Sequence, residues 1–491
     1  MAPSKWLPLL LVFGNLSFPQ TLQEQVQRVL ESSPAAQRTF WGVQVLDLEK
    51  GASLFELNSN HFFVPASNTK LFTTALALVR LGPDHRFYTT VVAEAPPDAS
   101  GRLAGDLRLV GGGDPSLSAR TVPYQKGPTV GNPLQAIEDL AAQVVSRGVR
   151  RIAGDVVGDD TAYLWAPYPE GWAQDDALWE YGAPVSALTI NDNAVSLTIR
   201  PSGLILSPAL EYYVIDNRLR VGPQLERRIR LERLPGARQL RLWGTLPAGS
   251  SAEAQLLLAI DDPALYAAYA LSDALTRRGV AISGRPVARH RFANEVLDLT
   301  TRPAASPAAS GVELARRSSP PLVELLRIID KVSQNLHAEL VLREVARLRR
   351  HIGSREAGLE ELRQFLTEAA IEETSYRIED GSGLSRLNLV TPDTVARLLA
   401  HMYRSPHRDA WLSLLPIGGE DGTLASRFDG NPEARRIRAK TGTVSHVSAL
   451  AGYVESRSRG LLAFSILANN YNAPASEIRT IIDRIGIVLA Q

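Results

Sequence analysis

Three short motifs in the sequence contain the residue types needed for catalysis by an activated serine. Ser67 precedes Lys70 by three residues, and two further motifs, Ser333-Gln334-Asn335 and Lys440-Thr441-Gly442, each occur once. A serine hydroxyl is a weak nucleophile until a neighbouring base removes its proton. A lysine amine can act as that base when burial or a nearby cation lowers its pKa, whereas arginine keeps its proton. The chain has 47 arginines but only six lysines, which indicates that position 70 requires an amine.

Local patterns place each motif on an element that could position it. Pro65 ends the preceding element, and after it apolar residues recur at helical spacing as far as Gly82, which is suited to end a helix. Ser67 is therefore predicted to lie at the start of this helix. The second motif is predicted to lie in a turn directly before a helix. The third is predicted to lie on a strand that is followed by two further strands.

The distribution of helical and strand patterns predicts an α+β fold with an insertion. Residues 20–90 and 300–491 contain helical and antiparallel-strand patterns, which predict one catalytic domain with an antiparallel sheet flanked by helices. Between them, short apolar stretches separated by Gly, Pro and Asp are typical of β-rich structure. We predict that this insertion forms one or two extra domains, with the divisions 91–163 plus 265–299 and 164–264. A Pro/Ala/Ser-rich stretch at 301–311 is predicted to be a linker.

Composition excludes several classes of function. The 491 residues are 45% hydrophobic with a net charge of +1, which is typical of a globular protein and gives no electrostatic signature of nucleic-acid binding. The absence of cysteine excludes disulfides, thiol nucleophiles and Cys-based zinc sites. No aspartate lies in metal-ligand spacing with a histidine, so neither a metal nor an organic cofactor is expected.

The N-terminus has the features of a secretory signal. Residues 1–19 combine a short segment carrying Lys5 with an apolar stretch that is too short to span a bilayer comfortably. We therefore expect secretion to the periplasm or cell envelope, with loose membrane association as a further expectation. An uncleaved anchor and a buried N-terminal element are the alternatives.

The order and spacing of the motifs resemble those of a known enzyme family. Active-serine penicillin-recognising enzymes carry S-x-x-K, then S-x-N or Y-x-N, then K-T-G or K-S-G. Here 266 residues separate the first two serines and 107 separate Ser333 from Lys440. The long first interval resembles the class C low-molecular-mass penicillin-binding proteins, the DacB-type D-alanyl-D-alanine carboxypeptidase/endopeptidase family. Further matching stretches are "GGGDPSL" at 111–117, "YGAPVSALTINDNAV" at 181–195, "DGSGLSR" at 380–386 and "DGTL" at 421–424.

The resemblance implies a penicillin-recognising serine transpeptidase-like domain and a reaction through an acyl-enzyme on Ser67. Lys70 would be the base, Ser333 would relay a proton to the leaving amine and Asn335 would hold the peptide. The backbone N–H groups of Ser67 and Thr443 would form the oxyanion hole. The carboxylate of the substrate would be bound by Lys440, Thr441, Gly442 and Thr443. Expected partners are peptidoglycan stem peptides and β-lactams, the latter as covalent inhibitors.

One residue of the predicted insertion receives a separate hypothesis from the family. An aspartate of the inserted domain binds the free amine of the third stem-peptide residue in the family, and the matching residue here is Asp160. A turn residue is the alternative reading of Asp160.

Three other functions stay open. A Ser-His-Asp hydrolase is disfavoured because the chain has no G-x-S-x-G elbow. A β-lactamase-like or esterase-like hydrolase would use the same three motifs and differ in how fast the acyl-enzyme is hydrolysed. A peptidoglycan-binding scaffold would need none of the catalytic residues.

Overall fold

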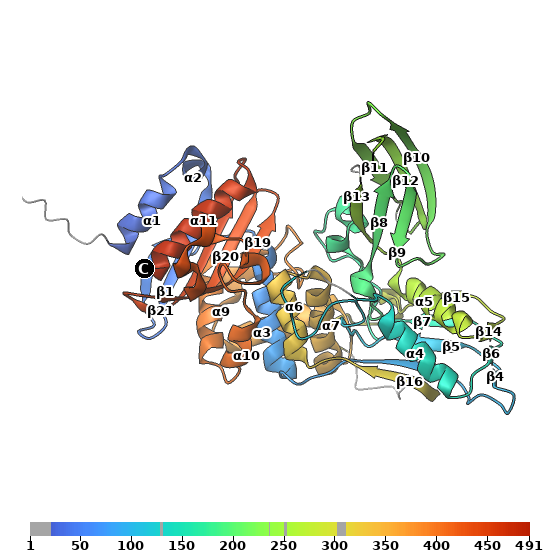
Figure 1. Cartoon of the computed structure of the whole chain (residues 1–491). Helices are drawn as coiled ribbons and strands as arrows, with labels where there is room; N and C mark the ends of the chain where they lie inside the picture. Colours follow the sequence, from blue (N-terminus) through green and yellow to red (C-terminus); the bar gives the residue numbers. More distant parts are fainter. Residues whose placement is uncertain (1–20, 128–130, 235, 250–252, 302–310) are drawn as a thin grey trace, which may run out of the picture.

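The structure is a computed structural model that describes residues 21–127, 131–234, 236–249, 253–301 and 311–491. The predicted signal peptide and all but the two ends of the predicted linker lie outside these ranges. The two ends of the chain together form one lobe, and the middle of the chain forms a second lobe beside it (Figure 1). None of the helices in the described ranges has the length and apolar composition needed to cross a bilayer.

The first lobe is built on a five-stranded antiparallel sheet that joins the two ends of the chain. Its strand order is β19-β20-β21-β1-β2, and β1 pairs along its whole length with β21. The strand β20 is buried at nearly every position because helices cover both faces of the sheet. The strands are β1 (Phe40–Asp47), β2 (Ser53–Leu57), β19 (Ile437–Val444), β20 (Val447–Ser456) and β21 (Gly460–Asn469).

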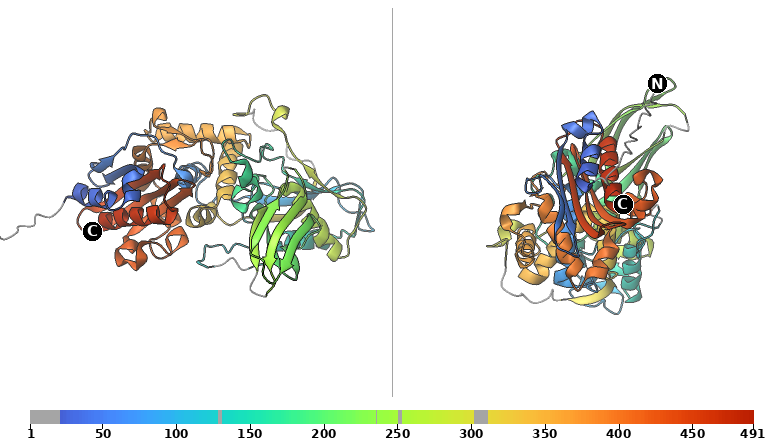
Figure 2. Two further views of the ribbon diagram at one scale, coloured as in Figure 1. Left: turned by 90° about the horizontal axis from the view of Figure 1, so that it is seen from above. Right: turned by 90° about the vertical axis from the view of Figure 1, so that its left-hand side faces the viewer.

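Alternate residues of the sheet pack against two separate sets of helices, which Figure 2 shows on opposite sides of it. On one face, Leu450 and Ile466 pack with α1 (Leu22–Leu30), α2 (Pro34–Arg38) and α11 (Ala475–Ala490). On the other face, Ala449 and Leu467 pack with the remaining helices of the lobe. These are α3 (Thr69–Leu81), α6 (Leu322–Val332), α7 (Asn335–Arg350), α8 (Arg355–Glu368), α9 (Pro392–Arg404) and α10 (Arg408–Leu414). The predicted α+β arrangement of a sheet flanked by helices is confirmed.

The second lobe contains a mixed sheet. Its strands β3 and β16 lie side by side where the chain enters and leaves this lobe. The strand order is β15-β7-β5-β3-β16, with β3 antiparallel to β16 and β5 parallel to β7. These strands are β3 (Tyr88–Ala93), β5 (Leu107–Val110), β7 (Val156–Asp159), β15 (Pro286–Arg289) and β16 (Val312–Ser318). The strand β16 lies beyond residue 299 in the chain, and the predicted domain boundaries stay a prediction. A small sheet of β4 (Arg102–Leu103), β6 (Arg151–Ile152) and β14 (Ala281–Ile282) lies beside it.

Two helices in this lobe were not predicted from the sequence. They are α4 (Gln135–Ser146) and α5 (Pro263–Arg277). Asp262 caps α5 by accepting a hydrogen bond from the Leu265 N–H, and Pro263 occupies its first turn. Both helices lie in a stretch whose Gly- and Pro-rich sequence is otherwise typical of strands and turns, which obscures their helical pattern.

The part of the second lobe that projects furthest consists of two three-stranded sheets (Figure 1). One has the order β13-β8-β9 and the other β10-β12-β11. Buried side chains of both sheets belong to the same apolar cluster as the side chains of α4, α5 and the mixed sheet. The strands are β8 (Ala194–Arg200), β9 (Gly203–Ser207), β10 (Val214–Gly222), β11 (Arg228–Glu232), β12 (Gln239–Pro247) and β13 (Ala254–Ala259). The division of the insertion into two domains stays a prediction.

Candidate active site

The first motif lies where a single 3-10 turn, Ala66–Asn68, leads into α3. Ser67 is half-buried in this turn and Lys70 is fully buried in the first turn of α3. The Lys70 Nζ lies 3.0 Å from the Ser67 Oγ. The spacing of three residues therefore places the amine and the hydroxyl on one side of the helix start, as one helical turn requires.

The second motif forms the junction between α6 and α7. Ser333 ends α6 in the left-handed conformation with φ of +62°, and the Gln334 side chain caps α7 by accepting a hydrogen bond from the Leu336 N–H at 2.8 Å. The Asn335 Oδ1 accepts a hydrogen bond of 2.6 Å from the Lys70 Nζ. Its Nδ2 donates to the carbonyl of Tyr181 at 2.8 Å, so this amide connects the lysine to the inserted lobe.

The third motif lies on β19 and passes beside the turn that carries Ser67. The buried Lys440 Nζ donates to the Ser333 Oγ at 2.9 Å and to the Thr441 carbonyl at 2.8 Å. A Cβ on Gly442 would lie 2.7 Å from the Pro65 carbonyl oxygen and 3.2 Å from the Ser67 nitrogen, so glycine is needed for this close approach. Thr443 is exposed at the end of the motif. The structure thus brings all three motifs together.

Burial lowers the pKa of both lysines, and the charge of Lys440 lowers the pKa of Lys70 further. The pKa of Lys70 is held well below its ordinary value, first by burial and then by the positive charge of Lys440. Burial also lowers the pKa of Lys440, against the opposing effect of Asp330. Burial raises the pKa of Asp330, which accepts a hydrogen bond from Thr74. The site therefore contains two buried amines that lose their protons more readily than an exposed lysine does.

A loop at 380–388 completes the surroundings of Lys70 and received no role from the sequence. The Ser382 carbonyl accepts a hydrogen bond of 2.5 Å from the Lys70 Nζ. The backbone N–H groups of Gly381 and Ser382 both donate to the buried Glu339 on α7. The loop is therefore fixed to the same helix that begins with Asn335.

The buried carboxylate of Asp380 organises the rest of this loop. It accepts five hydrogen bonds, from the backbone N–H groups of Gly383 and Ser385 and from the side chains of Trp172, Ser382 and Asn388. The "DGSGLSR" stretch had been noted only as a family match, and its Asp-Gly-Ser-Gly composition is the signal for a turn of this kind. Asp330 carried no sequence signal because its effect depends on lysines that are distant in the chain.

The motif "DGTL" at 421–424 contacts β19 through a side chain of the third motif. The Thr423 hydroxyl is hydrogen-bonded to the Thr441 hydroxyl at 2.9 Å. The Lys331 Nζ donates to Asp421 at 2.5 Å. The first contact connects the Thr441 side chain to this motif, and the second connects the motif to the last turn of α6.

Residues 22–491 match the family model described as D-Ala-D-Ala carboxypeptidase 3 (S13). The chain belongs to the D-Ala-D-Ala carboxypeptidase 3 (S13) family. The predicted membership of the DacB-type group is therefore confirmed.

Two curated relatives align with this chain along most of their length. The D-alanyl-D-alanine carboxypeptidase of Actinomadura sp. (strain R39) is 34% identical over 488 residues, which cover 96% of this chain and 84% of the relative. The D-alanyl-D-alanine carboxypeptidase DacB of Haemophilus influenzae is 25% identical over 456 residues, which cover 88% of this chain and 86% of the relative.

A solved structure has the same fold. The crystal structure of penicillin binding protein 4 (dacB) from Haemophilus influenzae matches with a TM-score of 0.78 at 23% identity, covering 94% of this chain and 97% of that chain. The fold of the S13 chain, including the insertion, is thereby shared with a penicillin-binding protein of known structure.

Within the described residues, Asp160 has no hydrogen bond or ion pair with the three motifs. Its buried carboxylate accepts a hydrogen bond of 2.8 Å from the Ser186 hydroxyl and lies 3.0 Å from the His290 Nδ1. These contacts are sufficient to explain an aspartate at this position, and the amine-binding role stays a prediction from the family resemblance. Within the described ranges, no cluster of three His, Asp or Glu residues has the geometry of a metal site.

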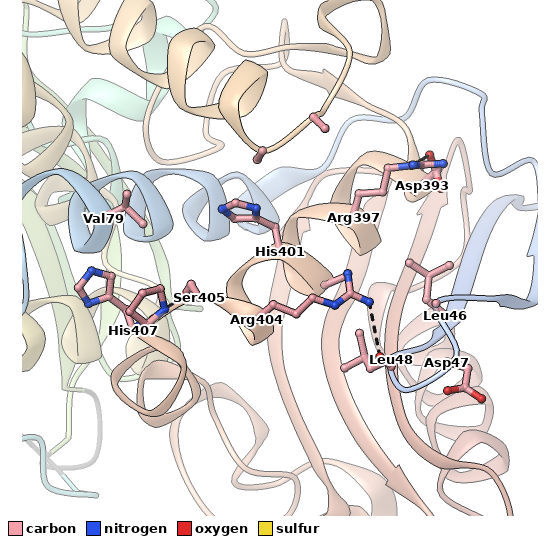
Figure 3. Close-up of a pocket in the computed structure, with 15 residues that line it drawn as sticks. Leu46, Asp47, Leu48, Val79, Asp393, Arg397, His401, Arg404, Ser405 and His407 are labelled. Carbon is pink, nitrogen blue, oxygen red and sulfur yellow. Dashed lines mark hydrogen bonds and ion pairs between the residues drawn. The ribbon is translucent and has the colours of Figure 1, made fainter.

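A cavity of about 630 Å³ lies elsewhere on the catalytic lobe (Figure 3). Its lining includes Leu46 and Leu48 on and after β1, and Arg397, His401 and Arg404 on α9. None of the three motifs contributes to it, so it is not the active site of this S13 family member.

Proposed function

We propose that the chain is a serine D,D-peptidase that acts on peptidoglycan stem peptides. It would remove the terminal D-alanine, cleave cross-links that contain D-alanine, or do both, through an acyl-enzyme on Ser67. The observation that carries the proposal is the 3.0 Å distance between the Ser67 Oγ and the Nζ of Lys70, a buried amine whose pKa is well below its ordinary value. Membership of the D-Ala-D-Ala carboxypeptidase 3 family supports the same reaction.

Acylation would begin with proton transfer from the Ser67 hydroxyl to the neutral Lys70 amine. As the proton leaves, the Oγ bonds to the carbonyl carbon of the penultimate D-alanine, and the backbone N–H groups of Ser67 and Thr443 stabilise the oxyanion. The C–N bond then breaks, and the proton that Lys70 took from Ser67 passes to the leaving amine through the Ser333 hydroxyl, which contacts Lys440. D-Alanine departs and water hydrolyses the ester, which restores Ser67.

Substrate recognition would use the exposed edge of β19. Lys440 provides a positive charge. Thr441, Gly442 and Thr443 follow it on β19, where the strand passes beside the turn that carries Ser67. A terminal carboxylate is complementary to this arrangement, and Asn335 can hold the peptide amide. The same edge would accept the carboxylate of a β-lactam, whose tethered leaving group would obstruct the deacylating water. A structure of the Haemophilus influenzae protein in complex with a β-lactam, with a TM-score of 0.74, supports β-lactams as ligands.

The substrate also bears on where the protein acts. We propose that residues 1–19 direct the chain to the periplasm or cell envelope, where peptidoglycan is located, and that any membrane association is loose. Fractionation of cells that express the full chain, with N-terminal sequencing of the mature protein, tests this location. Recovery of the intact chain in the cytosol would contradict it.

The function is tested with a fluorescent penicillin and defined muropeptides. We expect stable labelling of the wild-type chain and loss of labelling in Ser67→Ala. We also expect release of D-alanine from monomeric muropeptides or conversion of cross-linked muropeptides to monomers, with the products identified by mass. Rapid turnover of the penicillin without a stable adduct would instead favour a β-lactamase-like or esterase-like hydrolase. Binding of muropeptides with neither labelling nor products would favour a scaffold.

The acylation rate should depend on pH in two opposite ways. The rate should rise with pH as Lys70 loses its proton, because the base must be neutral, and fall at higher pH as Lys440 loses the charge that holds the carboxylate. Both limbs should lie below the ordinary lysine pKa of about 10.4. Rates of penicillin acylation in wild type and Lys440→Arg provide the test. Since arginine keeps its charge, the alkaline limb should move to higher pH in the variant, and an unchanged alkaline limb would contradict the assignment.

The amine-binding role of Asp160 makes a distinct prediction. If Asp160 receives the amine of the third stem residue, Asp160→Asn should slow turnover of stem peptides that carry this amine more than turnover of the acetylated peptide. Penicillin acylation should change little. Equal losses on all three compounds would show that Asp160 acts only through its contacts with Ser186 and His290.

A further inference from the structure

The outward face of the sheet β10-β12-β11 carries an unusual combination of side chains. Trp243 lies on the central strand, in register with Arg218 on β10 and with Arg230 on β11. Alternate residues of β12, Leu240 and Leu242, are buried on the opposite face. We call the outward face the arginine face; it consists of Val214, Asp216, Arg218, Arg220, Arg228, Arg230, Glu232, Gln239, Arg241, Trp243 and Thr245.

The charge of this region differs from that of the whole chain. Residues 214–247 contain eight arginines and three acidic residues, an excess of five positive charges, whereas the chain as a whole has a net charge of +1. The three strands themselves carry five of these arginines and two of the acidic residues, an excess of three positive charges. This excess creates a local positive potential that attracts anionic partners.

Several of these arginines are free to bind a partner. Arg218 and Arg228 pair with Asp216 and Glu226 at the surface, but their side chains remain 72% and 76% exposed. Arg220 and Arg230 are exposed and have neither a hydrogen bond nor an ion pair within the part of the chain that the structure describes. Trp243 is 41% exposed between them, which is uncommon for so large an apolar side chain without a binding role.

We infer that the arginine face binds the polymeric form of the substrate, a peptidoglycan strand with its stem peptides. Guanidinium groups match the fork geometry of carboxylates, and each uncrosslinked stem peptide ends in a carboxylate. The flat ring of Trp243 can stack on a sugar ring of the glycan. This inference rests on the proposed function for the identity of the polymer.

The location of the arginine face is suited to binding the polymer and not to catalysing its cleavage. The sheet belongs to the part of the inserted lobe that projects away from the catalytic lobe (Figure 1). A strand held there would keep its neighbouring stem peptides near Ser67 and raise their effective concentration at the site. Short soluble peptides would gain nothing from this contact.

The test separates binding to the polymer from catalysis. Binding of full-length Ser67→Ala protein to insoluble peptidoglycan is measured by co-sedimentation, with and without the additional changes Arg220→Glu and Arg230→Glu. We expect the charge reversals to weaken binding about tenfold or more, and higher salt to weaken wild-type binding. The matched control is Arg377→Glu with Arg457→Glu, which reverses two exposed charges on the catalytic lobe and should leave binding unchanged.

A second variant tests the aromatic contact. Trp243→Ala in the Ser67→Ala background should also weaken co-sedimentation. In the Ser67 enzyme, both arginine-face variants should slow D-alanine release from insoluble peptidoglycan while leaving penicillin acylation unchanged. The unchanged acylation also shows that the chain is folded.

Other outcomes overturn one proposal or the other. Equal binding by the charge-reversed protein and its control, or binding by this face to anionic phospholipid vesicles or nucleic acid but not to peptidoglycan, would overturn the arginine-face inference. If the wild-type chain neither reacts with penicillin nor releases D-alanine, the proposed function fails. Loss of polymer binding in the arginine-face variants would still support the inference in that case, because it is measured without catalysis.

Discussion

Lys70→Arg is expected to lower the rate of penicillin acylation by about 10²- to 10⁴-fold, the contribution typical of a general base. The variant keeps a positive charge beside Ser67, but a guanidinium cannot take the serine proton at any accessible pH. The loss should therefore persist across the pH range. Stopped-flow or gel-based measurement of fluorescent-penicillin labelling gives the rate directly.

A matched substitution controls for the change of side chain. Lys50→Arg alters an exposed lysine that pairs with Asp47 in the turn after β1, and it should leave the rate unchanged. Near-normal acylation by Lys70→Arg would show that another group is the base. Loss of thermal stability comparable to a core mutation would instead indicate that the larger side chain disrupts the buried site.

Asp380→Ala is expected to destabilise the catalytic lobe by about 3 to 5 kcal/mol and to reduce acylation strongly. The change removes the acceptor of five hydrogen bonds and leaves buried donors without a partner, which is more costly than the loss of the bonds themselves. The Ser382 carbonyl would then no longer be held against the Lys70 Nζ. Thermal unfolding and the penicillin acylation rate measure the two effects.

The control for this prediction is Asp409→Ala. The Asp409 side chain is 93% exposed, and its removal should change stability by less than about 0.5 kcal/mol. An Asp380→Ala protein with the stability and acylation rate of this control would mean that the loop at 380–388 is not needed to position Lys70.

The parts of the site that the sequence predicted are those defined by residue type and order. Ser67 and Lys70 could be placed because three residues make about one helical turn, and the KTG motif could be placed because strand patterns surround it. The identity of the fold followed from the same three motifs and their spacing. Local chemistry was sufficient for these features.

The remaining parts depend on contacts between residues far apart in the chain. Asp330 matters because it is buried near Lys70 and Lys440, and no local pattern reports that proximity. The same holds for Trp172 and Asp380, which lie 208 residues apart and meet in a hydrogen bond. The helices α4 and α5 were missed for a different reason, since their many alanines weaken the apolar periodicity on which helix prediction depends.

The contacts between the inserted lobe and the catalytic loop limit how the enzyme can be shortened. Trp172 donates to Asp380, the Glu170 carbonyl accepts from Ser385, and the Tyr181 carbonyl accepts from Asn335. A truncated protein that joined β3 directly to β16 would lose all three contacts. A minimal version of the enzyme for engineering would therefore have to retain or replace the segment 170–181, even if the projecting sheets were removed.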